Sequence, residues 1–297
     1  MNKPFANIIV PAVTPYLDDL SLDKAGVEKV FAYFDELPDL DGIFITGATG
    51  EYDVLTLDER KYILDLACEM NLQKGWVPNT TTLDQQSSME LTEYAASRGI
   101  GTIGVILPQE CRSFQDVQIF LQKLLSYGVS IFIYQTGNGP YPLSAGEMGQ
   151  VIQLGDIVGI KDSCSPRDFY RHLRYISDYG DQIKVIQGVE MLYLSSLAMG
   201  GHGVIGGGCN VYPKLIRDVR DLYLEGRNEE AAIVQKRVNQ LVELLYHEGT
   251  GNEAMKYYLS LCGVPIGWAS RKTKTPLSEA QKIVMQDMYA EIYGSPE

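Results

Sequence analysis

The stretch Asp156-Ile157-Val158-Gly159-Ile160-Lys161-Asp162 is an apolar run of strand length that ends on a lysine. A turn signal, Ser163 to Pro166, follows it directly. If the strand belongs to a closed parallel barrel, Lys161 lies at the C-terminal mouth, where such folds keep their catalytic groups. A lysine at a strand end is usually only a surface residue whose stem lies along apolar neighbours. The rest of the chain has to decide between these two interpretations.

Seven further runs of the same kind occur along the chain. The eight strand candidates are Ile8–Val13, Gly42–Thr46, Trp76–Thr80, Thr102–Leu107, Ser130–Tyr134, Ile157–Lys161, Ile183–Gln187 and Gly203–Gly206. Segments with apolar residues three and four positions apart lie between them, which is typical of amphipathic helices. The predicted helix starts are Thr56 with Glu59 and Ser144 with Glu147, both capping boxes, and Ser165 before Pro166.

Eight strand and helix repeats in about 220 residues predict an α/β fold, specifically a (β/α)8 TIM barrel spanning residues 1–226. A doubly wound open sheet is the main alternative, but its first strand usually leads into a glycine-rich turn, and here Val13-Thr14-Pro15-Tyr16 follows. Residues 227–297 read almost wholly as helix, at 228–247, 253–262 and 277–293. We expect this extension to pack on the barrel as part of one unit, because no low-complexity linker precedes it.

Composition excludes several classes of protein. The 297 residues are 45% hydrophobic and 21% charged, which is ordinary for a globular chain. The net charge of -13 argues against a nucleic-acid partner and against an anionic membrane surface. No apolar run approaches membrane-spanning length, and the N-terminal residues do not form a signal peptide. Five scattered cysteines with no CxxC pair predict a reducing, cytoplasmic location.

Candidate binding and catalytic residues lie at the ends of several predicted strands. Gly47-Ala48-Thr49-Gly50-Glu51 is a tight turn whose backbone N–H groups, with the Thr49 hydroxyl, suit a carboxylate ligand. The alternative is a purely structural turn with Glu51 as a local carboxylate. Tyr134 ends the fifth strand, one strand before Lys161, where a phenol can move a proton to or from a reacting oxygen. Both features are predicted to lie on the same face of the barrel as Lys161.

Glycines dominate the eighth strand, Gly200 to Gly208. They permit the close approach of a substrate, or they serve only to let the last strand bend and close the barrel. None of the three histidines, His172, His202 and His247, has a metal-ligand partner at a recognisable spacing. We therefore expect no metal and no other cofactor, although His202 lies beside the predicted rim.

These residues carry a family resemblance. Gly47–Glu51 resembles the GTTGE motif, Tyr134 the tyrosine of the YN-P motif, and Gly159–Asp162 the GIKD motif of the dihydrodipicolinate synthase and N-acetylneuraminate lyase family of class I aldolases. The glycine-rich eighth strand is also similar. The resemblance spans nearly the whole chain, including residues 10–15 and the helical extension.

The resemblance implies a barrel whose lysine forms a Schiff base with pyruvate or another 2-oxo acid. By position, Lys161 is the Schiff-base lysine and Tyr134 the proton-transfer residue. Gly47, Ala48 and Thr49 would bind the carboxylate, and the carbonyl of Ile205 would line the site. The amine attacks a ketone only when it is neutral, and the apolar residues of its own strand favour that form. The family is commonly oligomeric, so a homotetramer or homodimer is implied.

Departures from the family pattern bear on the substrate. Ala48 replaces the first hydroxyl of the GTTGE motif, and residues 108–111 replace a pair of tyrosines. No arginine follows Tyr134 to bind a second carboxylate, which makes lysine biosynthesis doubtful. Several polar or small residues are instead predicted to line the barrel mouth, where they would bind hydroxyl groups of the substrate and set specificity for its distal end. They are Gln109, Glu110, Gln135, Asn138 and Gly188.

Three hypotheses remain open. The first is a Schiff-base aldolase, lyase or dehydratase acting on a 2-oxo sugar acid or related 2-oxo acid, with dihydrodipicolinate synthase itself as an alternative within the same chemistry. The second is a barrel that binds a 2-oxo acid without catalysis, motivated by Ala48 and the missing tyrosines. The third is a metal-dependent aldolase that uses His202 with nearby carboxylates, for which the sequence offers no visible ligand set.

Overall fold

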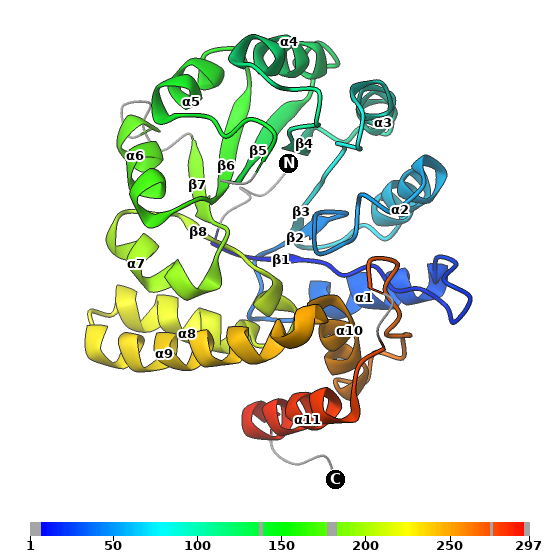
Figure 1. The fold of residues 1–297 in the computed structure, drawn as a ribbon, viewed down its shortest axis with the longest axis vertical. Helices are drawn as coiled ribbons and strands as arrows, with labels where there is room; N and C mark the ends of the chain where they lie inside the picture. Colours follow the sequence, from blue (N-terminus) through cyan, green and yellow to red (C-terminus); the bar gives the residue numbers. More distant parts are fainter. Residues whose placement is uncertain (1–6, 137–138, 177–182, 274–275, 294–297) are drawn as a thin grey trace.

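Eight parallel strands form one sheet that curves into a barrel, with helices on its outside (Figure 1). A computed structural model describes residues 7–136, 139–176, 183–273 and 276–293. The sheet order is β3-β2-β1-β8-β7-β6-β5-β4. β3 and β4 approach each other through a parallel bridge between Asn79 and Gly104, and the Thr80 N–H donates to the Gly104 carbonyl at 3.1 Å. The barrel is therefore nearly closed.

The strands are short, as expected for a barrel of this kind. They are β1 (Asn7–Pro11), β2 (Gly42–Ile45), β3 (Gly75–Pro78), β4 (Thr102–Ile106), β5 (Ser130–Thr136), β6 (Ile157–Ser163), β7 (Lys184–Gln187) and β8 (Gly203–Ile205). All eight predicted strands are confirmed, and their bounds differ by a few residues at most. The (β/α)8 barrel is thus the observed fold, and the doubly wound sheet is excluded.

The helices alternate with the strands and then continue beyond them. They are α1 (Lys24–Glu36), α2 (Leu57–Glu69), α3 (Gln85–Ser97), α4 (Phe114–Leu125), α5 (Ala145–Ile152), α6 (Pro166–Ile176), α7 (Tyr193–Ala198), α8 (Pro213–Leu224), α9 (Asn228–Leu245), α10 (Gly251–Leu261) and α11 (Glu279–Tyr293). Short 3-10 turns lie at Glu190–Leu192, Gly207–Asn210 and His247–Gly249.

Local sequence signals determine where the helices begin. Capping boxes join Thr56 to Glu59 at the start of α2 and Ser144 to Glu147 at the start of α5, as predicted. Each box satisfies backbone N–H groups that the first helical turn leaves without partners. At α6 the Ser165 hydroxyl accepts from the Asp168 N–H at 3.3 Å, so this predicted start is also confirmed.

Side chains alternate between the inside and the outside of the barrel, because successive strand residues point to opposite faces. An inner cluster consists of Ile9, Phe44, Val77, Phe132, Ile186 and Ile205, all at most 2% exposed. The outward residues pack against the helices, for example Ile131, Ile133 and Ile160. The barrel is therefore filled by side chains beneath its mouth.

The C-terminal helices pack on one side of the barrel. In Figure 1, α9 runs beside α8, and α11 lies next to α10. Val30 of α1, Val238 of α9, Met255 of α10 and Met285 of α11 belong to one cluster of buried apolar residues. No helix among the described residues is long and apolar enough to cross a membrane.

Candidate active site

Lys161 and Tyr134 lie in contact at the carboxyl ends of neighbouring strands. The register of β5 and β6 pairs Tyr134 with Lys161 directly. The Lys161 ammonium lies 3.8 Å from the centroid of the Tyr134 ring, and Lys161 is only 7% exposed. The positive charge of Lys161 lowers the pKa of the Tyr134 phenol, although burial acts in the opposite direction. The predicted nucleophile and the predicted proton-transfer group are thus placed side by side.

The inner apolar cluster forms the floor under this pair. Phe132 lies two residues before Tyr134 on β5, and Gly159 lies two residues before Lys161 on β6. Both positions therefore face the barrel interior, below the pair formed by Lys161 and Tyr134. A Cβ on Gly159 would lie 2.6 Å from Phe132 Cδ2, which shows that the aromatic ring occupies the space beside this glycine. The floor excludes water from below and lowers the local dielectric constant around Lys161.

Gly188 and Glu190, which follow β7, lie in the same region as Lys161. A Cβ on Gly188 would clash with Ser163 Oγ and would lie 2.9 Å from Lys161 Cε, so Gly188 leaves room for the Ser163 side chain and for the lysine stem. Glu190 is 5% exposed and its carboxyl group accepts from the Gly208 N–H at 2.5 Å. Burial raises the pKa of Glu190, and the charge of Lys161 opposes that shift. Glu190 therefore brings a carboxyl group with an increased affinity for a proton to the site.

The turn after β2 is exposed at its centre and anchored at its ends. Ala48 is exposed and Thr49 is half-buried, while Gly47 and Glu51 are buried. The Glu51 N–H donates to the Ala48 carbonyl at 3.1 Å, and the Tyr52 N–H donates to the Gly47 carbonyl at 3.3 Å. This geometry presents the middle of the turn to a ligand. Ile205 lies in the inner cluster at the end of β8.

The five residues predicted to set distal specificity are distributed over different environments. Gln109 and Glu110 are exposed after β4, and Glu110 accepts from the Gln85 N–H of α3 at 3.3 Å. Gln135 is 2% exposed and its amide donates to the Leu143 carbonyl at 3.2 Å. It still belongs to β5, so its side chain points away from the barrel interior, opposite to Tyr134. Asn138 lies outside the described residues, and Gly188 adjoins Lys161.

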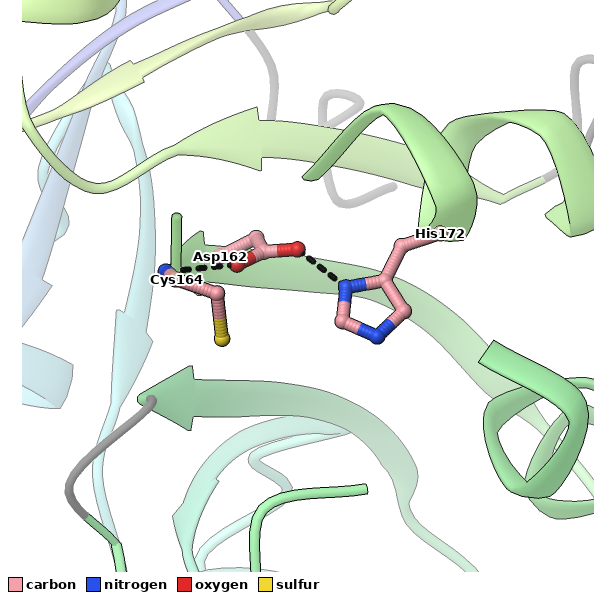
Figure 2. A group of neighbouring side chains, drawn as sticks. All are labelled: Asp162, Cys164 and His172. Atoms are coloured by element: carbon pink, nitrogen blue, oxygen red, sulfur yellow. Dashed lines mark hydrogen bonds and ion pairs between the residues drawn. The ribbon is translucent and has the colours of Figure 1, made fainter. Parts of the chain in front are cut away.

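Asp162, which directly follows Lys161 on β6, binds His172 of α6 (Figure 2). The carboxylate contacts His172 Nδ1 through one oxygen and accepts from the Cys164 N–H at 2.8 Å through the other. His172 Nε2 lies 3.2 Å from the Leu143 carbonyl. Both ring nitrogens thus face oxygen acceptors, which is satisfied only when both carry a proton. Burial lowers the pKa of His172, but its hydrogen bond and charge interaction with Asp162 outweigh that effect and raise it.

Asp162, Cys164 and His172 also form a group whose ligand atoms all lie within 4.8 Å of one another. The sequence analysis missed this cluster because the partners are on a strand end and on the buried face of α6. Metal–ligand bonds of about 2 Å at tetrahedral angles place two ligand atoms about 3 Å apart. A metal ion shared by Asp162 and His172 would therefore need that separation between the Asp162 carboxylate oxygen and His172 Nδ1. These two atoms instead make a direct hydrogen bond. The geometry is that of an ion pair.

His202 lies at the opposite end of the barrel from Lys161. It directly precedes β8, at the amino end of that strand, and its Nδ1 accepts from the Val185 N–H at 3.2 Å. Lys161 lies near the carboxyl end of β6, and all strands are parallel. The expectation that His202 adjoins the catalytic rim is therefore wrong, and it cannot supply a metal ligand beside Lys161.

Glu190 is a site residue that the sequence analysis did not identify. It is buried, and its charge interacts with those of Lys161 and Tyr134. The available signal was its position two residues after Gly188, immediately beyond the seventh predicted strand, where barrel enzymes place functional groups.

Residues 4–291 match the Dihydrodipicolinate synthetase family. The chain is 26% identical to an N-acetylneuraminate lyase of Rhizobium meliloti over 286 residues, which cover 94% of this chain and 93% of the relative. It is 24% identical to an uncharacterised DapA-like lyase of Pyrococcus horikoshii over 262 residues, which cover 87% of this chain and 91% of the relative.

Solved structures share the fold. An N-acetylneuraminate lyase of Mycoplasma synoviae has a TM-score of 0.87 at 23% identity, with 98% of each chain covered. A prophage protein of the dihydrodipicolinic acid synthase family from E. coli K12, solved with pyruvate, has a TM-score of 0.87 at 22% identity, with 98% of this chain and 99% of that chain covered.

Proposed function

The chain belongs to the dihydrodipicolinate synthetase family, whose members include lyases that act through a Schiff base, and we propose that it is a lyase or dehydratase for a 2-oxo sugar acid or related 2-oxo acid. The observation that carries this proposal is the contact between Lys161 and Tyr134 above an apolar floor, 3.8 Å from ammonium to ring centroid. An amine nucleophile with an adjacent proton-transfer group is the minimum that such chemistry needs.

The proposed reaction starts with attack of the neutral Lys161 amine on the C2 carbonyl of the 2-oxo acid. Loss of one water, with one proton supplied by the Tyr134 phenol, gives an iminium and leaves Tyr134 as a phenolate. The iminium withdraws electrons from the neighbouring carbons. In an aldol cleavage, the bond between C3 and C4 breaks, its electrons enter the iminium to give an enamine, and the C4 hydroxyl proton passes to the Tyr134 oxygen. Tyr134 returns a proton to C3, and water then releases pyruvate from Lys161. In a dehydration, the Tyr134 phenolate takes the proton from C3 to give the enamine, the enamine electrons expel the C4 hydroxyl group, and Tyr134 gives that group the proton with which it leaves as water.

The carboxylate end of the substrate is assigned to the turn after β2. Gly47 is the buried start of this turn, Ala48 and Thr49 form its exposed part, and Thr49 contributes a hydroxyl donor. The carbonyl of Ile205 and the rim at Gly188 and Glu190 would bound the remaining space. Glu190 replaces Gln135 among the groups assigned to substrate hydroxyls, because the Gln135 amide is already bound to Leu143.

Borohydride trapping tests the function. Incubation with pyruvate or another 2-oxo acid and borohydride should add the mass of the reduced adduct to the peptide that carries Lys161. Lys161→Met should abolish the adduct, and Lys184→Met should retain it, because Lys184 starts the adjacent strand at the other end of the barrel. Absence of an adduct with every member of a panel of 2-oxo acids would refute the proposal.

Turnover distinguishes the alternatives. Release of pyruvate from a 2-oxo sugar acid indicates cleavage, and an unbroken carbon chain that has lost water indicates dehydration. Trapping of pyruvate without turnover of any second substrate would instead favour the binding barrel without catalysis. Formation of the dihydrodipicolinate synthase product would favour that enzyme.

The cellular location and the oligomeric state are also proposed. We propose a cytoplasmic enzyme that acts as a homotetramer or homodimer. All five cysteines are free thiols, which agrees with a reducing compartment. Oligomerisation is supported by the family resemblance, and light scattering at several concentrations tests it. We further propose that residues 1–226 and 227–297 unfold together as one unit, which a single calorimetric transition would support.

A further inference from the structure

The carboxylate of Glu51, at the end of the turn after β2, is bound by residues of the C-terminal part of the chain. Glu51 is 0% exposed. Its Oε1 accepts from Lys256 Nζ of α10 at 2.7 Å. Its Oε2 accepts from the Ser270 hydroxyl at 2.8 Å and from the Arg271 N–H at 3.0 Å. Three donors from residues 256–271 thus satisfy one carboxylate of the barrel.

Lys256, the cation of this contact, is equally buried. Its side chain is 0% exposed, and it also donates to the Ala269 carbonyl at 2.7 Å. The ammonium lies 4.5 Å from the centroid of the Tyr16 ring. Burial lowers the pKa of Lys256, and the charge of Glu51 opposes that shift. A buried pair of this kind leaves an uncompensated charge when either partner is removed.

The turn depends on its anchors because one of its residues adopts an unfavourable conformation. Glu51 has a φ of 57°, in the left-handed region that residues with a Cβ seldom occupy. The Gly50 carbonyl accepts from the Thr14 hydroxyl at 2.7 Å, which fixes the turn against the segment after β1. Glu51 therefore holds the turn from one side and Thr14 from the other, while Ala48, which is exposed, and Thr49, which is half-buried, lie between them.

We propose that Lys256 is a positioning residue for binding of the substrate carboxylate, acting through Glu51 on the backbone of Ala48 and Thr49. The assignment of the ligand rests on the proposed function. The C-terminal extension is then part of the construction of the substrate site, although none of its residues needs to touch the reacting atoms. Lys256 sets how well the turn is preorganised, so its loss weakens binding of the 2-oxo acid more than it slows chemistry at Lys161.

Two measurements on Lys256→Met test the proposal. The first is amide hydrogen exchange of the peptide that covers residues 47–52, without any ligand. It should become about tenfold faster or more, because the anchor of Glu51 is lost. The second is the pyruvate concentration that half-saturates borohydride trapping. It should rise about 10- to 100-fold, while the trapping rate at saturation stays within about twofold of the wild type. Lys236→Met, on the exposed face of α9, is the matched control and should change neither quantity.

A second variant covers the case in which Lys256→Met does not fold. Ser270→Ala retains the ion pair and removes one of the three donors to Glu51, so it should raise the half-saturating concentration about threefold. A folded Lys256→Met with unchanged exchange and unchanged half-saturation would overturn the proposal, as would an unchanged Ser270→Ala when Lys256→Met is unfolded. If the wild type forms no adduct with any 2-oxo acid, the proposed function fails, and the exchange of residues 47–52 still decides whether Lys256 holds the turn.

Discussion

Replacing His172 by leucine removes the partner of Asp162, a buried carboxylate that directly follows Lys161 in the chain. His172 is 2% exposed and Asp162 is 0% exposed, so the variant leaves the Asp162 charge inside the protein without its cation. Removing one member of a buried pair costs about 3 to 5 kcal/mol of stability. The expected result is a decrease of this size in the free energy of unfolding, measured by urea denaturation at pH 6.

The pH dependence follows from the direction of the His172 shift. Its pKa in the folded protein is raised above the ordinary value of about 6.5, so above pH 6.5 the folded state retains a proton that the unfolded state has lost. The contribution of His172 to the free energy of unfolding is therefore complete below pH 6.5, and it is lost as the pH rises through the raised pKa of His172. This single group lowers the stability of the wild type by at most about 1.4 kcal/mol per pH unit in that window.

The difference in the free energy of unfolding between the wild type and His172→Leu should consequently become smaller from pH 6 to pH 9. His247→Leu is the matched control, since His247 is exposed in a 3-10 turn. A loss of less than about 1 kcal/mol for His172→Leu at pH 6 would refute the buried ion pair. A loss that is the same at pH 6 and pH 9 would refute the protonated state of His172.

Three further substitutions test the site and its floor. Tyr134→Phe should still form the pyruvate adduct on Lys161 but lower turnover about 100- to 10 000-fold, because the proton-transfer group is lost; turnover near that of the wild type would remove Tyr134 from the mechanism. Gly188→Ala places a Cβ in a clash with Ser163 Oγ and 2.9 Å from Lys161 Cε, and it should slow borohydride trapping about tenfold or more, whereas an unchanged trapping rate would show that both side chains can move aside without affecting the reaction of Lys161. Phe132→Ala empties part of the inner cluster and should lower the free energy of unfolding by about 3 to 5 kcal/mol in urea titrations, and a loss below about 1 kcal/mol would contradict its packing there.

The barrel was predictable from the sequence because its signals are local. Each strand is a short apolar run, and capping residues such as Thr56 and Ser144 mark helix starts within four residues of chain. The positions of Lys161 and Tyr134 follow from the same signals, since a residue at the end of a parallel strand must lie at the barrel mouth.

The orientation of Gln135 was not predictable from the same signals. The sequence predicts a strand that ends at Tyr134, but β5 continues to Thr136. Gln135 is therefore still subject to the alternation of strand side chains, and it points out of the barrel toward Leu143. An error of two residues at a strand end is enough to transfer a polar side chain from the site to the outer layer.

The partners of Asp162 and Glu51 required the tertiary structure. His172 is ten residues from Asp162, and it meets the carboxylate only because α6 packs against β6 with that face inward. Lys256 reads in the sequence as one more charged residue in a helical segment. Nothing in local periodicity indicates that the helix buries it against a turn in the first quarter of the chain.

The ion pair between Glu51 and Lys256 joins residues that are 205 positions apart, which has a consequence for synthesis of the protein. Ribosomes add about 5 to 20 residues per second, so about 10 to 40 s separate the two residues during translation. Throughout that interval the β2 turn has its carboxylate but not the cation that neutralises it. A nascent chain is thus expected to complete the proposed substrate site only near the end of translation, after most of the barrel has already been synthesised.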